Sequence, residues 1–166
     1  MRCIALAPDC NCIEYGGVKT PRLFLFAAAV SLVFAAFARA ESDWQHDYSK
    51  AQEEAKTNHK LLFLNFTGSD WCGWCIKLQK DTFSKPEFKK FAQESLVLVE
   101  LDFPRGKTQS DELKKQNEEL AEKFGIQGFP TLVLLDPQGK EAARNVGYLQ
   151  GGPEAFVQWV ESARNR

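Results

Sequence analysis

The feature that most constrains this chain is a pair of cysteines separated by two residues, Cys72 and Cys75, in the segment Trp71–Cys75 (WCGWC). Two thiols at this spacing can close a small disulfide and open it again, which suits electron exchange better than structural cross-linking. The apolar run 61–66 predicts a buried strand before the pair, and apolar positions recur at helical spacing after it. Cys72 is therefore expected at the exposed first turn of a helix, where the helix dipole stabilises a reactive thiolate.

A second segment narrows the interpretation. Residues 124–132 (FGIQGFPTL) place Gly-Phe-Pro-Thr at the start of another apolar strand. Together with the cysteine segment, this pattern resembles the thioredoxin family, and the resemblance covers residues 43–164. It implies an α/β, thioredoxin-like fold with a central mixed β-sheet flanked by helices on both faces.

The resemblance also implies roles for individual residues. Matched by position, Cys72 is the nucleophile that attacks a disulfide, and Cys75 is the thiol that resolves the mixed disulfide. The proline that matches Pro130 is cis in this family and lies beside the disulfide, which leaves the backbone of the preceding residue free to pair with a substrate strand. The predicted substrate-binding residues are Trp71, Gly73, Trp74, Phe129 and Pro130. For Trp74, plain packing is an equal alternative to substrate contact.

One residue departs from the family pattern. Thioredoxins place a buried aspartate in the strand before the motif, where it can accept the proton of the resolving thiol. Asn65 occupies that place here. Because an amide cannot act as the base, release of the mixed disulfide is predicted to be slow near neutral pH.

The alternative roles for a cysteine pair are structural and metal-binding. A zinc site needs four ligands, and the two histidines, His46 and His59, both lie upstream of the cysteines without metal-site spacing. Soft thiolates do suit Cu(I), so a copper-handling dithiol protein stays open as an alternative. A non-catalytic thioredoxin scaffold that binds peptides is another.

The first 40 residues are predicted to be a secretory signal. An uncharged run over residues 23–37 follows Arg22 and leads into Ala38-Arg39-Ala40, an A-x-A cleavage pattern. The run is shorter than the roughly 20 residues that a membrane helix needs. The expected organisation is a signal peptide over 1–40, cleaved after Ala40, and a thioredoxin-like domain over 41–166. The alternative is a leader retained as an anchor, the only membrane contact expected.

Hydrophobic periodicity and turn residues predict the remaining elements. The first expected helix runs from a capping box at Ser42–Gln45 to Asn58, and the others cover 73–82, a segment that begins at a second capping box at Ser84–Glu87, 111–124, and a segment from Gly151–Pro153 onward. The expected strands cover 61–66, 96–102 and 131–136, with a polar edge strand at 141–148.

The sequence thus predicts a secreted, periplasmic thiol–disulfide oxidoreductase that uses its own two sulfurs, with no cofactor and no metal. Reductase is the expected direction, because isomerases of this fold usually carry an extra dimerisation domain and the sequence predicts only one domain. The expected partners are client proteins with disulfides or thiols and an upstream electron donor, such as a membrane thiol reductase. The net charge of −1 and the lack of a basic face argue against nucleic acid. A monomer is expected.

Overall fold

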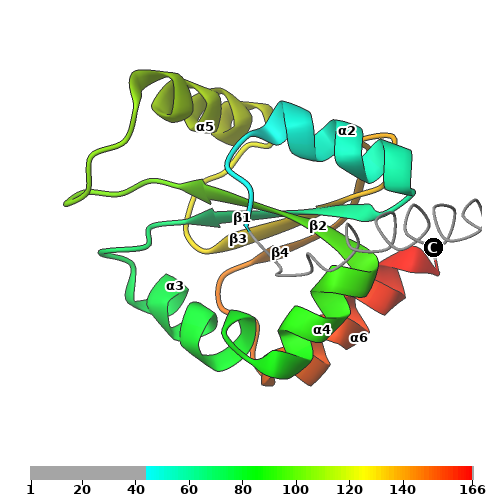
Figure 1. Ribbon diagram of the computed structural model, residues 1–166. Helices are drawn as coiled ribbons and strands as arrows, with labels where there is room; N and C mark the ends of the chain where they lie inside the picture. The colour runs from blue at the N-terminus through cyan, green and yellow to red at the C-terminus, as the bar shows by residue number, and fades with distance from the viewer. Residues whose placement is uncertain (1–43, 166) are drawn as a thin grey trace, which may run out of the picture. The chain divides into compact units, whose positions relative to one another are not determined.

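The computed structural model describes residues 44–165, and the statements below concern this part of the chain (Figure 1). The predicted signal peptide over 1–40, its cleavage after Ala40 and the cap expected at Ser42 lie outside the described residues.

A mixed sheet forms the centre of the domain, as the sequence predicted, and its strand order is β2-β1-β3-β4. Its strands are β1 (Leu61–Thr67), β2 (Leu96–Asp102), β3 (Thr131–Leu135) and β4 (Glu141–Val146). β1 pairs in parallel with β2 and antiparallel with β3, and β4 lies at the edge of the sheet beside β3. The carboxyl ends of β1 and β2 therefore meet the start of β3 at one end of the sheet.

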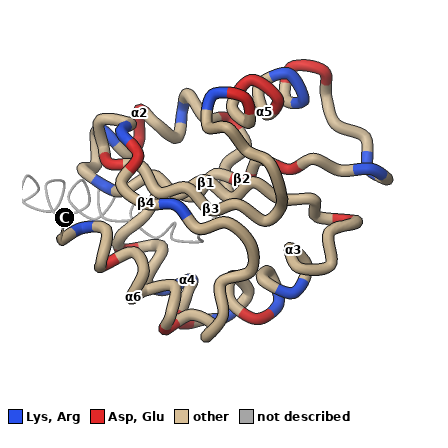
Figure 2. The backbone as a smooth tube through the Cα atoms, turned by 180° about the vertical axis from the view of Figure 1, so that it is seen from behind, with Lys and Arg blue, Asp and Glu red and all other residues tan. Residues whose placement is uncertain are grey.

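Helices cover both faces of this sheet. The elements are α2 (Tyr48–Asn58), α3 (Gly73–Leu78), the π-helix η2 (Gln79–Phe83), α4 (Pro86–Ser95), α5 (Asp111–Lys123) and α6 (Gly152–Arg164). In Figure 1, α2 and α5 lie on one face and α3, α4 and α6 on the other. Figure 2 shows that the central strands β1 and β3 carry no charged residue, whereas α5 carries charges of both signs.

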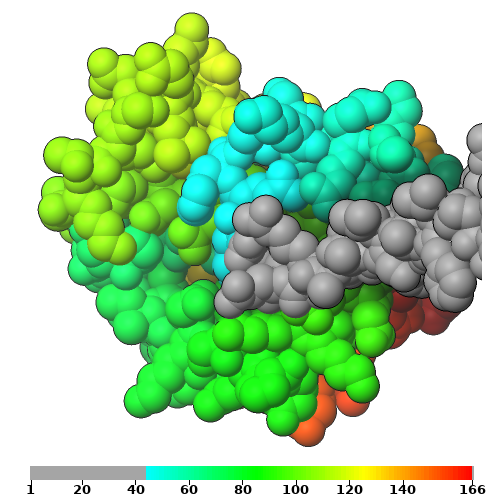
Figure 3. Space-filling view, viewed as in Figure 1, coloured from blue at the N-terminus to red at the C-terminus, as the bar shows by residue number. Residues whose placement is uncertain are grey.

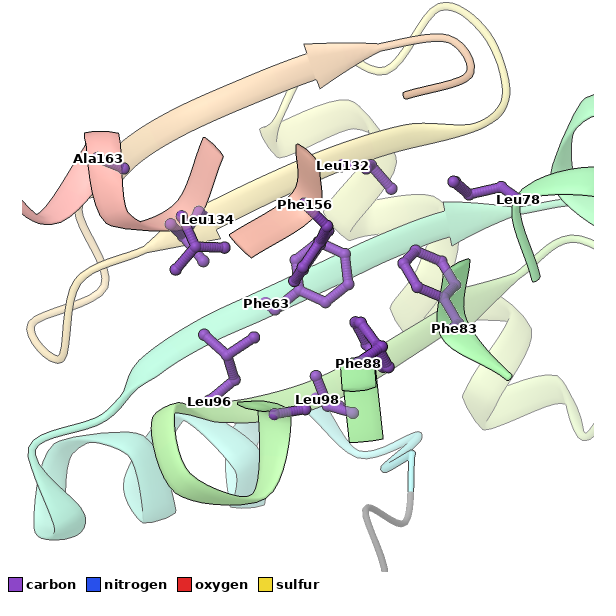
Figure 4. Packing of buried hydrophobic residues seen from close by; sticks show 12 residues of the cluster. Phe63, Leu78, Phe83, Phe88, Leu96, Leu98, Leu132, Leu134, Phe156 and Ala163 are labelled. Carbon is purple, nitrogen blue, oxygen red and sulfur yellow. The ribbon is translucent and has the colours of Figure 1, made fainter. Parts of the chain in front are cut away.

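Strand alternation divides the buried side chains into two clusters, one on each face. Phe63 of β1 points to the α4 and α6 face, where its ring centroid lies 5.0 Å from that of Phe156 (Figure 4). Its neighbours Leu62 and Leu64 belong to the cluster on the α2 side. On β2, Leu96 and Leu98 take the first face and Val97 and Val99 the second. Glu100 therefore continues the register of Leu98, on the face that α3 covers.

The N-terminal segment differs from the prediction. α2 begins at Tyr48, with Asp47 as its N-cap, and not at Ser42. Gln45 is extended and forms a bridge with Val99: its N–H donates to Leu98 O at 2.9 Å, and its carbonyl accepts from Glu100 N at 2.9 Å. This segment covers the outer edge of β2, which satisfies backbone groups that a helix would have left unpaired.

The second predicted capping box is also wrong. Ser84 lies after η2, and its hydroxyl donates to Lys80 O at 2.8 Å rather than to the start of α4. α4 instead begins after Lys85, with Pro86 in its first turn, where the missing N–H costs no helical hydrogen bond.

Candidate active site

Cys72 and Cys75 form a disulfide at the carboxyl end of β1, with their Cα atoms 5.2 Å apart. Cys72 is the N-cap of α3, and its Sγ accepts a hydrogen bond from Cys75 N at 3.2 Å. Both residues are buried, with exposed fractions of 7% for Cys72 and 4% for Cys75. The expectation that Cys72 is exposed is therefore corrected: what distinguishes it from Cys75 is the N-cap position, where a thiolate gains backbone N–H donors.

Trp71 is held in place from three sides. Its indole N–H donates to Phe103 O at 2.7 Å, and the Arg105 guanidinium lies 3.8 Å above its ring. Gly68 lies beneath the indole so closely that a Cβ there would come within 2.5 Å of Trp71 Cε2. This packing fixes a side chain that is still 36% exposed.

The loop after β2 is fastened to the segment before the cysteines. The Asp70 carboxylate accepts from Arg105 N at 3.1 Å and from Gly106 N at 2.6 Å. The hydrogen bond from the Arg105 backbone N–H has the largest effect, followed by that from Gly106, and together they hold the pKa of the Asp70 carboxyl below its ordinary value. Figure 3 shows the two segments in contact at the left of the domain. The loop over 103–106 is thereby part of the rim of the cysteine site.

Phe129 and Pro130 border the same site. The Phe129–Pro130 peptide bond is cis, as the resemblance implied. The Phe129 ring packs edge-on against Trp71, with centroids 5.8 Å apart, and lies 5.0 Å from the ring of Phe103. Gly147 N donates to Pro130 O at 2.8 Å, which ties this loop to the end of β4. The structure therefore brings Trp71, Phe129 and the cysteines together.

Trp74 lies apart from this group. It is 60% exposed, and its ring lies 5.6 Å from that of Tyr148. The Tyr148 hydroxyl donates to Asp81 Oδ2 at 2.9 Å, and Lys77 pairs with the same oxygen at 2.6 Å. The hydrogen bonds from Lys77 and from Tyr148 both lower the pKa of the Asp81 carboxyl, and the bond from Lys77 has the larger effect. Gly73 lies between Trp71 and Trp74 in the sequence, and a Cβ at this position would point into open space.

Sequence reasoning missed several of these residues. Lys77 was given no role, although its spacing from Asp81 is the (i, i+4) pattern of a helical ion pair. Tyr148 and Arg105 gave no readable signal, because their contacts with Trp74 and Trp71 join segments that are far apart in the sequence.

A cavity of about 270 Å³ lies beneath Cys75, between the ends of β1 and β2 and the helical segment α3–η2. Asn65, Gln79 and Glu100 contribute to its lining together with Cys75. Asn65 is only 3% exposed, and its Oδ1 has no hydrogen-bond partner. Burial raises the pKa of the Glu100 carboxyl, and the Asp102 charge adds to this effect. The sequence pattern assigned Glu100 no role.

Within residues 44–165, no group of three or more His, Cys, Asp or Glu side chains is placed to hold a metal ion. No helix in that range is both long and apolar enough to cross a membrane.

The position of Gly68 leads to a prediction about Trp71. Gly68→Ala should push the indole off Phe103 O and lower stability by about 1–3 kcal/mol, the usual cost of overpacking. Loss of the hydrogen-bonded Trp71 indole N–H signal in NMR spectra, with a lower melting temperature, is the expected result. Gly73→Ala is the matched control, because its Cβ meets open space. An unchanged Trp71 signal in Gly68→Ala would contradict the prediction.

Comparisons with known proteins agree with this geometry. A family model described as a thioredoxin-like domain matches residues 48–164. The disulfide bond reductase DsbH of Chlamydia pneumoniae is 44% identical over 126 residues, which are 76% of this chain and 75% of that protein. The thioredoxin-related protein DsbJ of the same organism is 35% identical over 61% of this chain but only 29% of its own length.

Solved structures give the same result. A DsbH oxidoreductase superposes with a TM-score of 0.70 at 38% identity, covering 92% of this chain and 95% of that one. The C-terminal domain of Neisseria meningitidis DsbD, in its oxidised form, gives a TM-score of 0.53 at 20% identity over 70% of this chain and 92% of that one, a similarity of fold alone.

Proposed function

Because this chain belongs to the thioredoxin-like family and is a thiol–disulfide oxidoreductase, we propose that it reduces disulfide bonds in client proteins, with Cys72 as the nucleophile and Cys75 as the resolving thiol. The Cys72 thiolate attacks a client disulfide and releases one client thiolate. The Cys75 thiolate then attacks Cys72 Sγ, which releases the second client thiolate and leaves the Cys72–Cys75 disulfide. A donor returns two electrons to complete the cycle.

The observation that carries this proposal is the environment of Cys72 Sγ. It accepts the Cys75 backbone N–H at 3.2 Å and lies at the start of a helical segment. Donors of this kind favour the thiolate over the thiol and so make Cys72 the better nucleophile. Cys75 lines the cavity and is bonded to Cys72 in the oxidised protein, so its sulfur is placed to attack Cys72 Sγ.

The surface around the cysteines supports binding of a client chain. Trp71 and Phe129 form an aromatic wall, and Gly73 leaves room beside Cys72. Trp74 offers a second exposed ring on the side of Tyr148. An extended client segment that crosses this surface would have its disulfide at Cys72 and aromatic contacts on both sides.

The relatives support a direction, a compartment and an electron donor for this protein. DsbH is named a disulfide bond reductase, which favours reduction here. DsbD, named a thiol:disulfide interchange protein, is 28% identical over 71% of this chain, although the match spans only 19% of the DsbD of Pasteurella multocida. We propose that the protein works as a monomer in the bacterial periplasm and receives electrons from a DsbD-like donor, for which a membrane thiol reductase is the expected kind of protein.

The test is insulin reduction with dithiothreitol, joined to the equilibrium potential of the cysteine pair against glutathione. A reductase should accelerate insulin precipitation and have a potential near the thioredoxin value of about −270 mV, rather than about −120 mV as in a strong oxidant. A potential near the oxidant value would reverse the proposed direction. No acceleration at all would favour the peptide-binding module, and tight Cu(I) titration by the dithiol would favour copper handling.

A further inference from the structure

We propose that Glu100 is the proton acceptor for Cys75, in place of the carboxylate that Asn65 does not supply. This inference rests on the proposed function and adds to it the residue that ionises the resolving thiol. When the mixed disulfide forms, the Cys75 thiol passes its proton to the Glu100 carboxylate. The resulting thiolate attacks Cys72 Sγ, the client thiolate leaves, and Glu100 later loses its proton to solvent.

The first support is position. Glu100 is the register partner of Asn65 on the adjacent parallel strand, so their side chains project from the same face of the sheet. That face is the one α3 covers, and Cys75 is on the buried side of α3. Glu100, Asn65 and Cys75 all line one cavity.

The second support is the polar character of that cavity. The unpaired Asn65 Oδ1 is a buried acceptor, and a buried acceptor without a partner is costly. A cavity of about 270 Å³ has room for water that would bond to this oxygen and link Glu100 to Cys75. Thr67 and Gln79 add polar side chains to the lining.

The third support is electrostatic. Burial and the neighbouring Asp102 raise the pKa of Glu100, while electrostatic interactions with His46 and Lys107 oppose this rise. Lys80 of η2 is the other charged residue that lines the cavity. A carboxylate whose pKa lies above its ordinary value is a stronger base and is better matched to a thiol.

The kinetic test uses reduced protein and an aromatic disulfide, dithiobis-nitrobenzoate, in a stopped-flow instrument. Attack by Cys72 releases the first coloured thiolate, and attack by Cys75 on the mixed disulfide releases the second. This leaving group departs as the anion, so the proton of Cys75 is the one that must move. In Glu100→Gln the second phase should slow by about 10²-fold near pH 7, the lower range for loss of a general base, with the first phase unchanged. Glu100→Asp should recover part of the rate.

The control is Glu94→Gln, a charge removal at an exposed position on α4. It should leave both phases unchanged. A Glu100→Gln variant with a wild-type second phase and pH profile would overturn the proposal. So would a faster second phase, which would show that Glu100 acts only as a negative charge that raises the pKa of Cys75. A wild-type protein that fails to reduce insulin would instead overturn the proposed function itself.

Titration gives a second readout that separates a base from a structural group. In a Cys72→Ser background, Glu100→Gln should lower the pKa of Cys75, because a like charge is removed, even though resolution becomes slower. More thiolate together with slower attack is the signature of a lost proton acceptor. An unchanged pKa of Cys75 would show that the two groups are not coupled and would overturn the proposal.

Stability against pH checks the burial of Glu100 in the oxidised protein, independently of activity. Because the folded-state pKa of Glu100 is raised, its contribution to stability is complete below the unfolded pKa and is lost as pH rises through the folded pKa. Glu100→Gln should therefore melt at a higher temperature than wild type near pH 8, with the gap closing toward about pH 4, the ordinary range for glutamate. A gap that does not change with pH would contradict a half-buried Glu100 with a raised pKa.

Discussion

Replacing Cys75 with alanine is expected to convert the protein into a trap that holds its clients as stable mixed disulfides through Cys72. The Cys72 thiolate still attacks, because its N-cap position and the backbone N–H of residue 75 are retained. The second step is lost, since residue 75 is the only cysteine besides Cys72 within the described residues. Non-reducing gels of a periplasmic extract should show client-sized bands that dithiothreitol removes.

The control for this trap is the double variant Cys72→Ala with Cys75→Ala, which should capture nothing. Identical bands from the double variant would show that capture does not involve Cys72. Absence of bands from Cys75→Ala alone would favour a module that binds peptides without exchanging disulfides.

Replacing Cys72 with alanine is expected to reduce insulin reduction to the rate of dithiothreitol alone. Only Cys72 has the N-cap position, whose backbone N–H donors favour a thiolate, so Cys72 is expected to be much the better nucleophile toward a client disulfide. Alkylation of the reduced wild-type protein for short times near pH 7 should label Cys72 almost alone, for the same reason. Residual activity in Cys72→Ala, or equal labelling of both cysteines, would contradict the assignment of the nucleophile.

The elements that local sequence determines could be predicted well. The run from Leu61 to Phe66 has no polar residue other than Asn65, and its strand extends only one residue further, to Thr67. Asp111 to Lys123 forms the expected helix, ending just before a glycine with positive φ, Gly125.

The errors arose where a distant segment competes for the same backbone groups. Ser42–Gln45 has the composition of a capping box, yet Gln45 pairs with β2 instead. The pairing energy with a strand that lies 54 residues further on, at Val99, is not visible in a local pattern. Likewise the anchor between Asp70 and the backbone of Arg105 joins two loops that only the sheet brings together.

Glu100 differs from these cases, because the sequence itself marks its position. It is a single acid within the otherwise apolar run Leu96–Leu101, at a position that alternation places on the covered face. A charged residue in such a place is either paired or functional, because an isolated buried charge is costly. The local pattern of β2 therefore contains the information that one acid lies at the floor of the cysteine site, whereas its distance from Cys75 depends on the fold.

The position of β1 between β2 and β3 also bears on the order in which the domain folds. Leu61 pairs with Leu96, whereas Leu62 pairs with Leu135, roughly twice as far along the chain. Closing the longer loop costs more entropy, so the β1–β2 unit with α3 and α4 is expected to form before the β3–β4 hairpin docks. Both cysteines belong to the early unit, and Phe129 and Pro130 arrive with the late one. The thiols are therefore expected to be present before the aromatic contact between Trp71 and Phe129 can form.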